Sequence, residues 1–267
     1  MRKGSDFYDT RLRQCSLSGS AIAWRPWCTR YFGAPCAQII LLRRRVGAPP
    51  NPIRSAIPFT QYIGRAFSLW SRYSGWTFLG CVVGLWTAAL FPAQVHRLIL
   101  IGSAPLTDAY VPQIMQRRLA NLSSSKANCM ANALAMLENG NSQQRQTAIE
   151  ALPALLAQSD AYQTAPEAVI PGDLWPEDEA AYANLWPLAV SLRTQGALLQ
   201  SALSVHCPID IIHGACDPHP AEGVCTPLRK IGVPFTLHLL PRCGHTPFTE
   251  RYAQDDFYQL MRTLCFA

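Results

Sequence analysis

The sequence IIHGACDPHPAEGV, residues 211–224, runs from an apolar segment through a glycine into a polar turn. PIDIIHG at 208–214 predicts a short buried strand that stops at Gly214. Asp217 follows three residues later. Catalytic groups of open α/β sheets lie just beyond the carboxyl ends of the strands, so this aspartate is a candidate site residue.

A second stretch repeats this arrangement nearer the C-terminus. FTLHLL at 235–240 predicts another strand, and the turn after it in LLPRCGHTPFTERYAQDDFY, residues 239–258, displays His245 behind a glycine. Asp217 precedes His245 by 28 residues. Alone, the aspartate would be interpreted as a turn residue and the histidine as a loop residue. In this order, at the ends of successive strands, they favour an acid–base pair.

The last two thirds of the chain have consistent local patterns. HRLILIG at 96–102 predicts a third strand, and RYAQDDFYQLMRTL at 251–264 predicts an amphipathic helix. The segments with helical spacing between them are MQRRLANL at 115–122, MANALAMLENG at 130–140 and QRQTAIEALPALLAQ at 144–158. This order predicts an α/β fold with a mostly parallel sheet, whose core is formed by residues 86–104 and 206–267 around a helical insertion at 105–205.

These motifs resemble the α/β-hydrolase superfamily, in particular its capped esterases and aminopeptidase-like members. In that family the acid lies in a HGxxD turn, which matches Asp217, and the base lies in a GH turn, which matches His245. FPAQVHRLILIGSAP at 91–105 is similar to the family's segment after the nucleophile helix. The resemblance covers residues 86–267 and implies an α/β-hydrolase-like sheet with a helical cap at 105–205.

The resemblance also implies a chemistry. It is the hydrolysis of small ester or amide substrates by a Ser-Asp-His mechanism, with no cofactor and no metal. His245 would take the nucleophile's proton and later protonate the leaving group, while Asp217 would orient the imidazole and stabilise its charged form. Backbone N–H groups would stabilise the oxyanion. The substrate stays open, because the aromatic residues of the predicted cap fit a core better than a pocket; they are Trp175, Tyr182 and Trp186.

The nucleophile is missing from its expected place. In the family it precedes the helix-ending proline by about 14 residues. Counting back from Pro92 in SGWTFLGCVVGLWTAALFP, residues 74–92, leads to Phe78. The nearby hydroxyl and thiol side chains are Ser74, Thr77 and Cys81, and none has glycine at both −2 and +2, as the sharp nucleophile turn requires. The nucleophile therefore stays unassigned, and the chain as written is expected to be inactive.

The N-terminal third has a different character. Residues 1–85 contain 12 Lys and Arg against Asp6 and Asp9, and the first glutamate of the chain is Glu138. No helical or strand period is sustained, and AQIILL at 37–42 is the only persuasive strand. We expect an irregular, basic segment. One alternative is a catalytically silent remnant or binding module with a basic N-terminal arm, although no nucleic-acid-binding motif accompanies it.

We hypothesise that residues 12–85 are translated out of frame, with the frame restored between Val82 and Trp86. Codons for WTFLGC, residues 76–81, read one nucleotide later, begin with a forced glycine and permit Gly-His-Ser-Leu-Gly, with its serine at position 78. AWRPWC at 23–28 likewise gives two forced glycines and permits a histidine before the first, as in the family's oxyanion loop. The rival is a divergent domain that has lost activity.

A zinc site is the other alternative, because histidines and cysteines are concentrated at residues 206–245. They are His206, Cys207, His213, Cys216, His219, Cys225, His238, Cys243 and His245. Zinc uses such ligands, but no C-x-x-C pair or usual ligand spacing is present. The acidic residues Asp210 and Glu250 are interpreted structurally, as a strand residue and a helix-start carboxylate.

Composition restricts the remaining classes. Apolar residues make up 49% of the chain, which supports a sizeable core. Ten cysteines in 267 residues do not resemble a small secreted disulfide framework. No apolar leader follows MRK, and no stretch is convincing as a membrane span. We expect a cytoplasmic protein with a small-molecule substrate and neither nucleic-acid nor membrane partners; its oligomeric state stays open.

Overall fold

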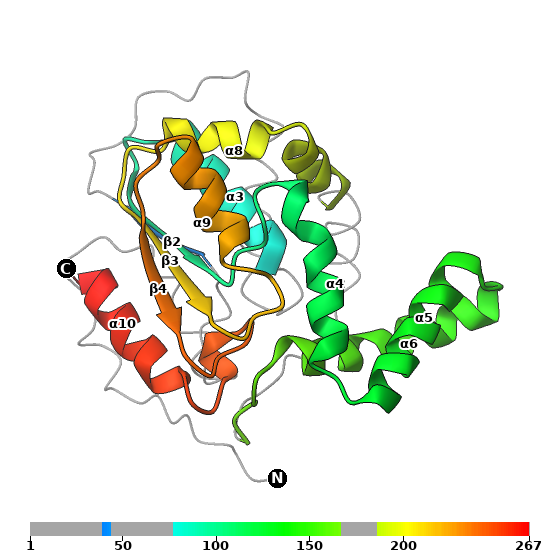
Figure 1. The fold of residues 1–267 in the computed structure, drawn as a ribbon. Helices are drawn as coiled ribbons and strands as arrows, with labels where there is room; N and C mark the ends of the chain where they lie inside the picture. The colour runs from blue at the N-terminus through cyan, green and yellow to red at the C-terminus, as the bar shows by residue number, and fades with distance from the viewer. Residues whose placement is uncertain (1–38, 44–76, 167–185, 267) are drawn as a thin grey trace, which may run out of the picture.

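A computed structural model describes residues 39–43, 77–166 and 186–266. Within these ranges, strands form one sheet in the order β1-β2-β3-β4 (Figure 1). Their bounds are Ile39–Arg43 for β1, Val95–Ile101 for β2, Ile209–Gly214 for β3 and Thr236–Leu240 for β4. β2, β3 and β4 run parallel, whereas β1 is antiparallel to β2. The predicted mostly parallel α/β sheet is therefore confirmed.

The central strands are apolar because helices cover both of their faces. Every residue of β3 is buried, including its one carboxylate. Leu98 and Leu100 of β2 pack with Ile211 of β3 on one face, while Ile99 and Ile212 pack on the other. Alternate residues of a strand point to opposite faces, so a strand buried on both sides has a nearly continuous apolar sequence.

Helices surround the sheet and form the insertion. Their bounds are Thr77–Leu90 for α3, Val111–Ala120 for α4, Ser124–Asn139 for α5, Ser142–Asp160 for α6, Ala197–Ser201 for α8, Glu222–Lys230 for α9 and Gln254–Phe266 for α10. Residues 186–194 are also helical. The 3₁₀ turns are η4 Asp108–Tyr110, η5 Ala202–Ser204 and η6 Pro247–Thr249. No helix in the described ranges is long and apolar enough to cross a membrane.

α3 and α9 cover one face of the sheet, and α10 covers the other (Figure 1). Leu85 of α3 and Leu228 of α9 belong to one buried cluster, and Phe257 and Met261 of α10 belong to the other. Leu264 completes the buried face of α10, as its helical spacing predicts, while Leu260 is partly buried at its margin.

The start of α3 differs from the expectation for residues 1–85. The helix begins at Thr77, so the last turns of that range are regular rather than irregular. Cys81, Val82 and Leu85 are buried against the sheet, and this apolar packing explains why the segment is helical. The described part of AQIILL, residues 39–42, lies in strand β1. Residues 1–38 and 44–76 lie outside the described part, and so does most of the proposed out-of-frame segment.

The segment between β2 and β3 holds α4, α5, α6, the helix at 186–194 and α8. α5 and α6 pack together away from the sheet (Figure 1) and share a small core of their own. That core includes Met130, Ala133, Ala148 and Leu152. Asn141 begins α6 with a reciprocal capping box to Gln144. Of the aromatic residues assigned to this region, Trp186 is 38% exposed, while Trp175 and Tyr182 lie outside the described residues.

Candidate active site

The loops after β3 and β4 are packed backbone to backbone. The N–H of Asp217 donates to the carbonyl of Gly214 at 3.2 Å, and the N–H of Cys216 donates to the carbonyl of Cys243 at 2.8 Å. A Cβ at position 214 would lie 2.1 Å from the carbonyl oxygen of Gly244. Only glycine permits this approach. The Gly214 of the HGxxD turn therefore allows the aspartate and histidine loops to meet.

This packing brings together the two residues that the sequence selects. His245 Nδ1 lies 2.8 Å from Asp217 Oδ2, and both residues are buried. Burial opposes the ionised form of Asp217, but the charges of His245 and His213 and the hydrogen bonds from the surrounding histidines hold its pKa well below the usual range. Burial also opposes a charged His245, yet the nearby Asp217 carboxylate raises the pKa of that imidazole. The arrangement is an oriented, basic histidine.

A second histidine, His219, contacts the other oxygen of the Asp217 carboxylate. The backbone N–H of His219 donates to Asp217 Oδ1 at 2.8 Å, and its ring Nδ1 lies 3.0 Å from the same oxygen. The rings of His219 and His245 stack, with their centroids 4.2 Å apart. Burial, followed by the charge of His245, lowers the pKa of His219. The lowered pKa of His219 and the raised pKa of His245 favour the neutral form of the first ring and the charged form of the second.

His213, near the end of β3, contacts the turn that carries Asp217 and His219. Its Nε2 lies 2.7 Å from the carbonyl oxygen of His219, to which it donates, and 3.3 Å from Asp217 Oδ2. Three imidazoles thus surround one buried carboxylate. The sequence interpretation placed His213 and His219 only among zinc candidates. The signal for their actual place was their spacing of four residues before and two residues after Asp217.

The predicted zinc ligands are not gathered into one site. Among the described residues, the group whose ligand atoms lie within 4.8 Å of one another is Asp217, His219 and His245, without a cysteine. Both histidine Nδ1 atoms already face the carboxylate, and the ring planes differ by only 28°. These contacts are hydrogen bonds of the buried Asp217 carboxylate, and they account for the cluster without a bound ion.

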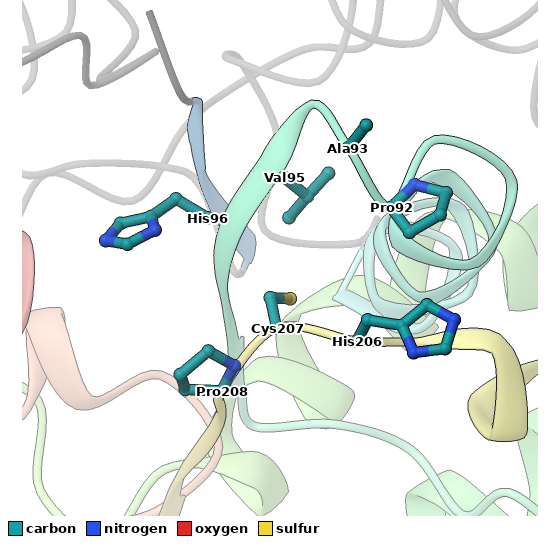
Figure 2. Close-up of a pocket in the computed structure, with 7 residues that line it drawn as sticks. All are labelled: Pro92, Ala93, Val95, His96, His206, Cys207 and Pro208. Atoms are coloured by element: carbon teal, nitrogen blue, oxygen red, sulfur yellow. The ribbon is translucent and has the colours of Figure 1, made fainter.

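Other members of that set lie at the opposite end of the sheet. A cavity of about 380 Å³ opens beside the start of β2 and the residues before β3 (Figure 2). It is lined by Pro92, Ala93, Val95, His96, His206, Cys207 and Pro208. These positions are at the amino ends of the strands, whereas Asp217 and His245 follow the carboxyl ends. The cavity is therefore separate from the candidate active site.

The structure agrees with the sequence interpretation of Asp210 and disagrees with that of Glu250. Asp210 lies in β3, as expected, and bonds Arg97 of β2 at 2.6 Å and His238 of β4 at 2.8 Å. The interpretation of Glu250 as a helix-start carboxylate is wrong. Its side chain is fully buried and accepts backbone N–H groups from Gly244 and from the insertion. The reason is tertiary, because a partner distant in the sequence occupies the carboxylate.

Position 78 lies in the first turn of α3 and carries phenylalanine. One turn further on, the Cys81 thiol lies 3.9 Å from the carbonyl oxygen of Ile101 at the end of β2. Burial raises the pKa of Cys81 to about 12. Because the thiolate is the nucleophilic form, Cys81 is unsuited to act as a nucleophile. Ser74 lies outside the described residues, and Thr77 is the first residue of the helix.

Alkylation measures the state of this thiol. With iodoacetamide at neutral pH, we expect Cys81 to react at least about 10³-fold more slowly than a cysteine of ordinary pKa, because so little thiolate is present. The exposed Cys129 is the internal reference. Both should react alike in denaturant. Equal labelling of the two in the native chain, measured by peptide mass spectrometry, would show that Cys81 is activated.

No family model matches the chain, and no curated protein matches it. Solved structures do. VinJ has 16% identity and a TM-score of 0.45, over 70% of this chain and 63% of its own. The enol-lactonase from Burkholderia xenovorans LB400 has 17% identity and a TM-score of 0.39, over 84% and 78%. E-2-(Acetamidomethylene)succinate hydrolase has 16% identity and a TM-score of 0.42, over 85% and 80%.

The chain spans less than two thirds of the first structures that it resembles, 63% for VinJ and 55% for a membrane phospholipase A. Similarities at TM-scores below 0.5 leave the activity open. The function is therefore inferred from the geometry of Asp217 and His245.

Proposed function

We propose that the chain derives from a capped α/β-hydrolase that hydrolyses small ester or amide substrates. The hydrogen bond of 2.8 Å between His245 Nδ1 and Asp217 Oδ2 carries this proposal. It joins the carboxyl ends of neighbouring parallel strands, where the active sites of open α/β sheets are built. The helical segment between β2 and β3 has the position of the cap in this proposal.

In this mechanism His245 acts through its other ring nitrogen. With the Nδ1 proton donated to Asp217, Nε2 would take a proton from a hydroxyl nucleophile. The alkoxide attacks the carbonyl carbon, and the imidazolium then returns the proton to the leaving alcohol or amine. Water repeats both steps to release the acid and regenerate the enzyme. Asp217 stabilises the imidazolium in each half of the cycle, which agrees with the raised pKa of His245.

The chain as written fits a catalytically silent relative, because position 78 carries Phe78. A phenyl ring has neither the lone pair nor the proton that the mechanism requires. The contact between Cys81 and Ile101 supports this assignment of the position, since it packs the beginning of α3 against the carboxyl end of β2. An intact relative would have its serine there.

The nucleotide sequence tests the out-of-frame hypothesis. Read one nucleotide later, the region encoding residues 12–85 should be open and contain Gly-His-Ser-x-Gly. The codon for Thr77 should end in A, because the shifted histidine codon needs that base. A stop codon in the shifted frame between codons 24 and 78, or any other third base for Thr77, would refute the hypothesis and favour a divergent domain.

A further inference from the structure

One buried carboxylate joins the helical insertion to the histidine loop. Glu250 is 0% exposed. Its Oε1 accepts the backbone N–H of Tyr162 at 2.8 Å and that of Gly244 at 2.9 Å. Its Oε2 accepts the N–H of Gln163 at 2.8 Å. Two of these donors follow α6, and the third immediately precedes His245.

Backbone groups rather than a cation satisfy this carboxylate. Within the described ranges, Glu250 forms no ion pair with a lysine or arginine. Three short N–H bonds replace the hydration that a buried acid loses, and hydrogen bonds to a charged acceptor are stronger than neutral ones. Moving the segment after α6 away would remove two of the three N–H donors and leave a buried carboxylate short of hydrogen-bond partners. The two loops are therefore expected to stay together or separate together.

Further backbone bonds extend the same contact. The N–H of His245 itself donates to the carbonyl of Asp160, the last residue of α6, at 2.8 Å. The N–H of Arg251 donates to Gln163, and that of Ala165 to Thr249, both at 2.8 Å.

The fit at Gly244 leaves no space for a side chain. A Cβ there would lie 2.2 Å from the carbonyl oxygen of Asp160 and 2.6 Å from Oε1 of Glu250. The Asp160 side chain in turn binds Arg118 of α4 through two bonds of 2.6 and 2.7 Å. The backbone of His245 is thus held by the insertion as well as by the sheet.

We infer that Glu250 is a positioning residue, which couples the seating of the helical insertion to the alignment of His245 with Asp217. The inference rests on the proposed function for its catalytic meaning, although the coupling itself does not require turnover. Its consequence is that the insertion must be docked for the histidine to face the carboxylate.

The test is Glu250→Gln in the full chain, with Glu222→Gln on the exposed start of α9 as the matched control. The glutamine amide group donates where the carboxylate accepted, so at least one N–H loses its partner. We expect hydrogen exchange at Tyr162, Gln163 and Gly244 to accelerate by at least about ten-fold, as for local opening. The NMR signal of the low-field Nδ1 proton of His245 should weaken, while hydrogen exchange in β2 stays unchanged.

A second variant covers the case in which Glu250→Gln fails to fold. Arg118→Gln removes the ion pair to Asp160 and leaves Glu250 in place, and it should weaken the same His245 signal. Unchanged exchange and an unchanged ring proton in the folded variants would overturn the inference. Because neither readout needs hydrolysis, failure of the proposed function would appear separately, as a frame-restored protein that aligns His245 but does not cleave esters.

Discussion

Restoring the shifted frame over residues 12–85 should convert an inactive chain into an esterase. Asp217 and His245 are already 2.8 Å apart, so the components to be added are a serine at position 78 and the oxyanion donors. Loss of a triad nucleophile costs about 10⁶-fold in rate, and its return should raise the rate on short acyl esters by several orders of magnitude. Initial rates of p-nitrophenyl acetate and butyrate hydrolysis measure the gain.

Variants of the restored protein separate the triad from general protein catalysis. His245→Ala should lower kcat by about 10⁴-fold to 10⁶-fold, and Asp217→Asn by about 10⁴-fold, because the imidazole loses its orienting partner. The chain as written should hydrolyse these esters no faster than buffer alone. If it instead showed strong activity that disappears with Thr77→Ala or Cys81→Ala, another nucleophile would operate and the assignment of position 78 would be wrong.

Asp217→Asn should also destabilise the frame-restored protein, by about 3 kcal/mol at neutral pH, because breaking a buried hydrogen-bonded ion pair leaves its partners uncompensated. Asp217 is 3% exposed and lies against three imidazoles. Urea denaturation of the two proteins gives the difference. Asp256→Asn, at the exposed start of α10, is the control and should be nearly neutral.

The pH dependence of this loss has a defined sign. The folded pKa of Asp217 lies below its unfolded value, so its contribution is full above about pH 4 and disappears as the pH falls through the folded pKa. The raised pKa of His245 adds a contribution that is full below about pH 6.5 and is lost as the pH rises through the folded pKa. The difference in unfolding free energy between the frame-restored protein and its Asp217→Asn variant should therefore become smaller at acidic pH. A gap that stays constant down to pH 2 would refute the assignment of the lowered pKa.

Local patterns were sufficient to predict the parallel strands and the pairing of Asp217 with His245. Both residues follow an apolar strand and a glycine, and the carboxyl ends of adjacent parallel strands meet at one edge of the sheet. The sequence also shows that Phe78 stands where the family spacing from Pro92 would place a nucleophile, because this is a matter of counting.

Only the tertiary structure decided what surrounds that pair. Glu250 resembled a helix-start residue, yet it accepts from Gln163, 87 residues earlier in the chain. His219 resembled a zinc ligand, yet it stacks on His245 and shares Asp217. Periodicity and motif spacing report which face a residue lies on and where an element ends. They carry no information on which distant backbone donors fill a buried carboxylate, because that depends on how the insertion packs against the sheet.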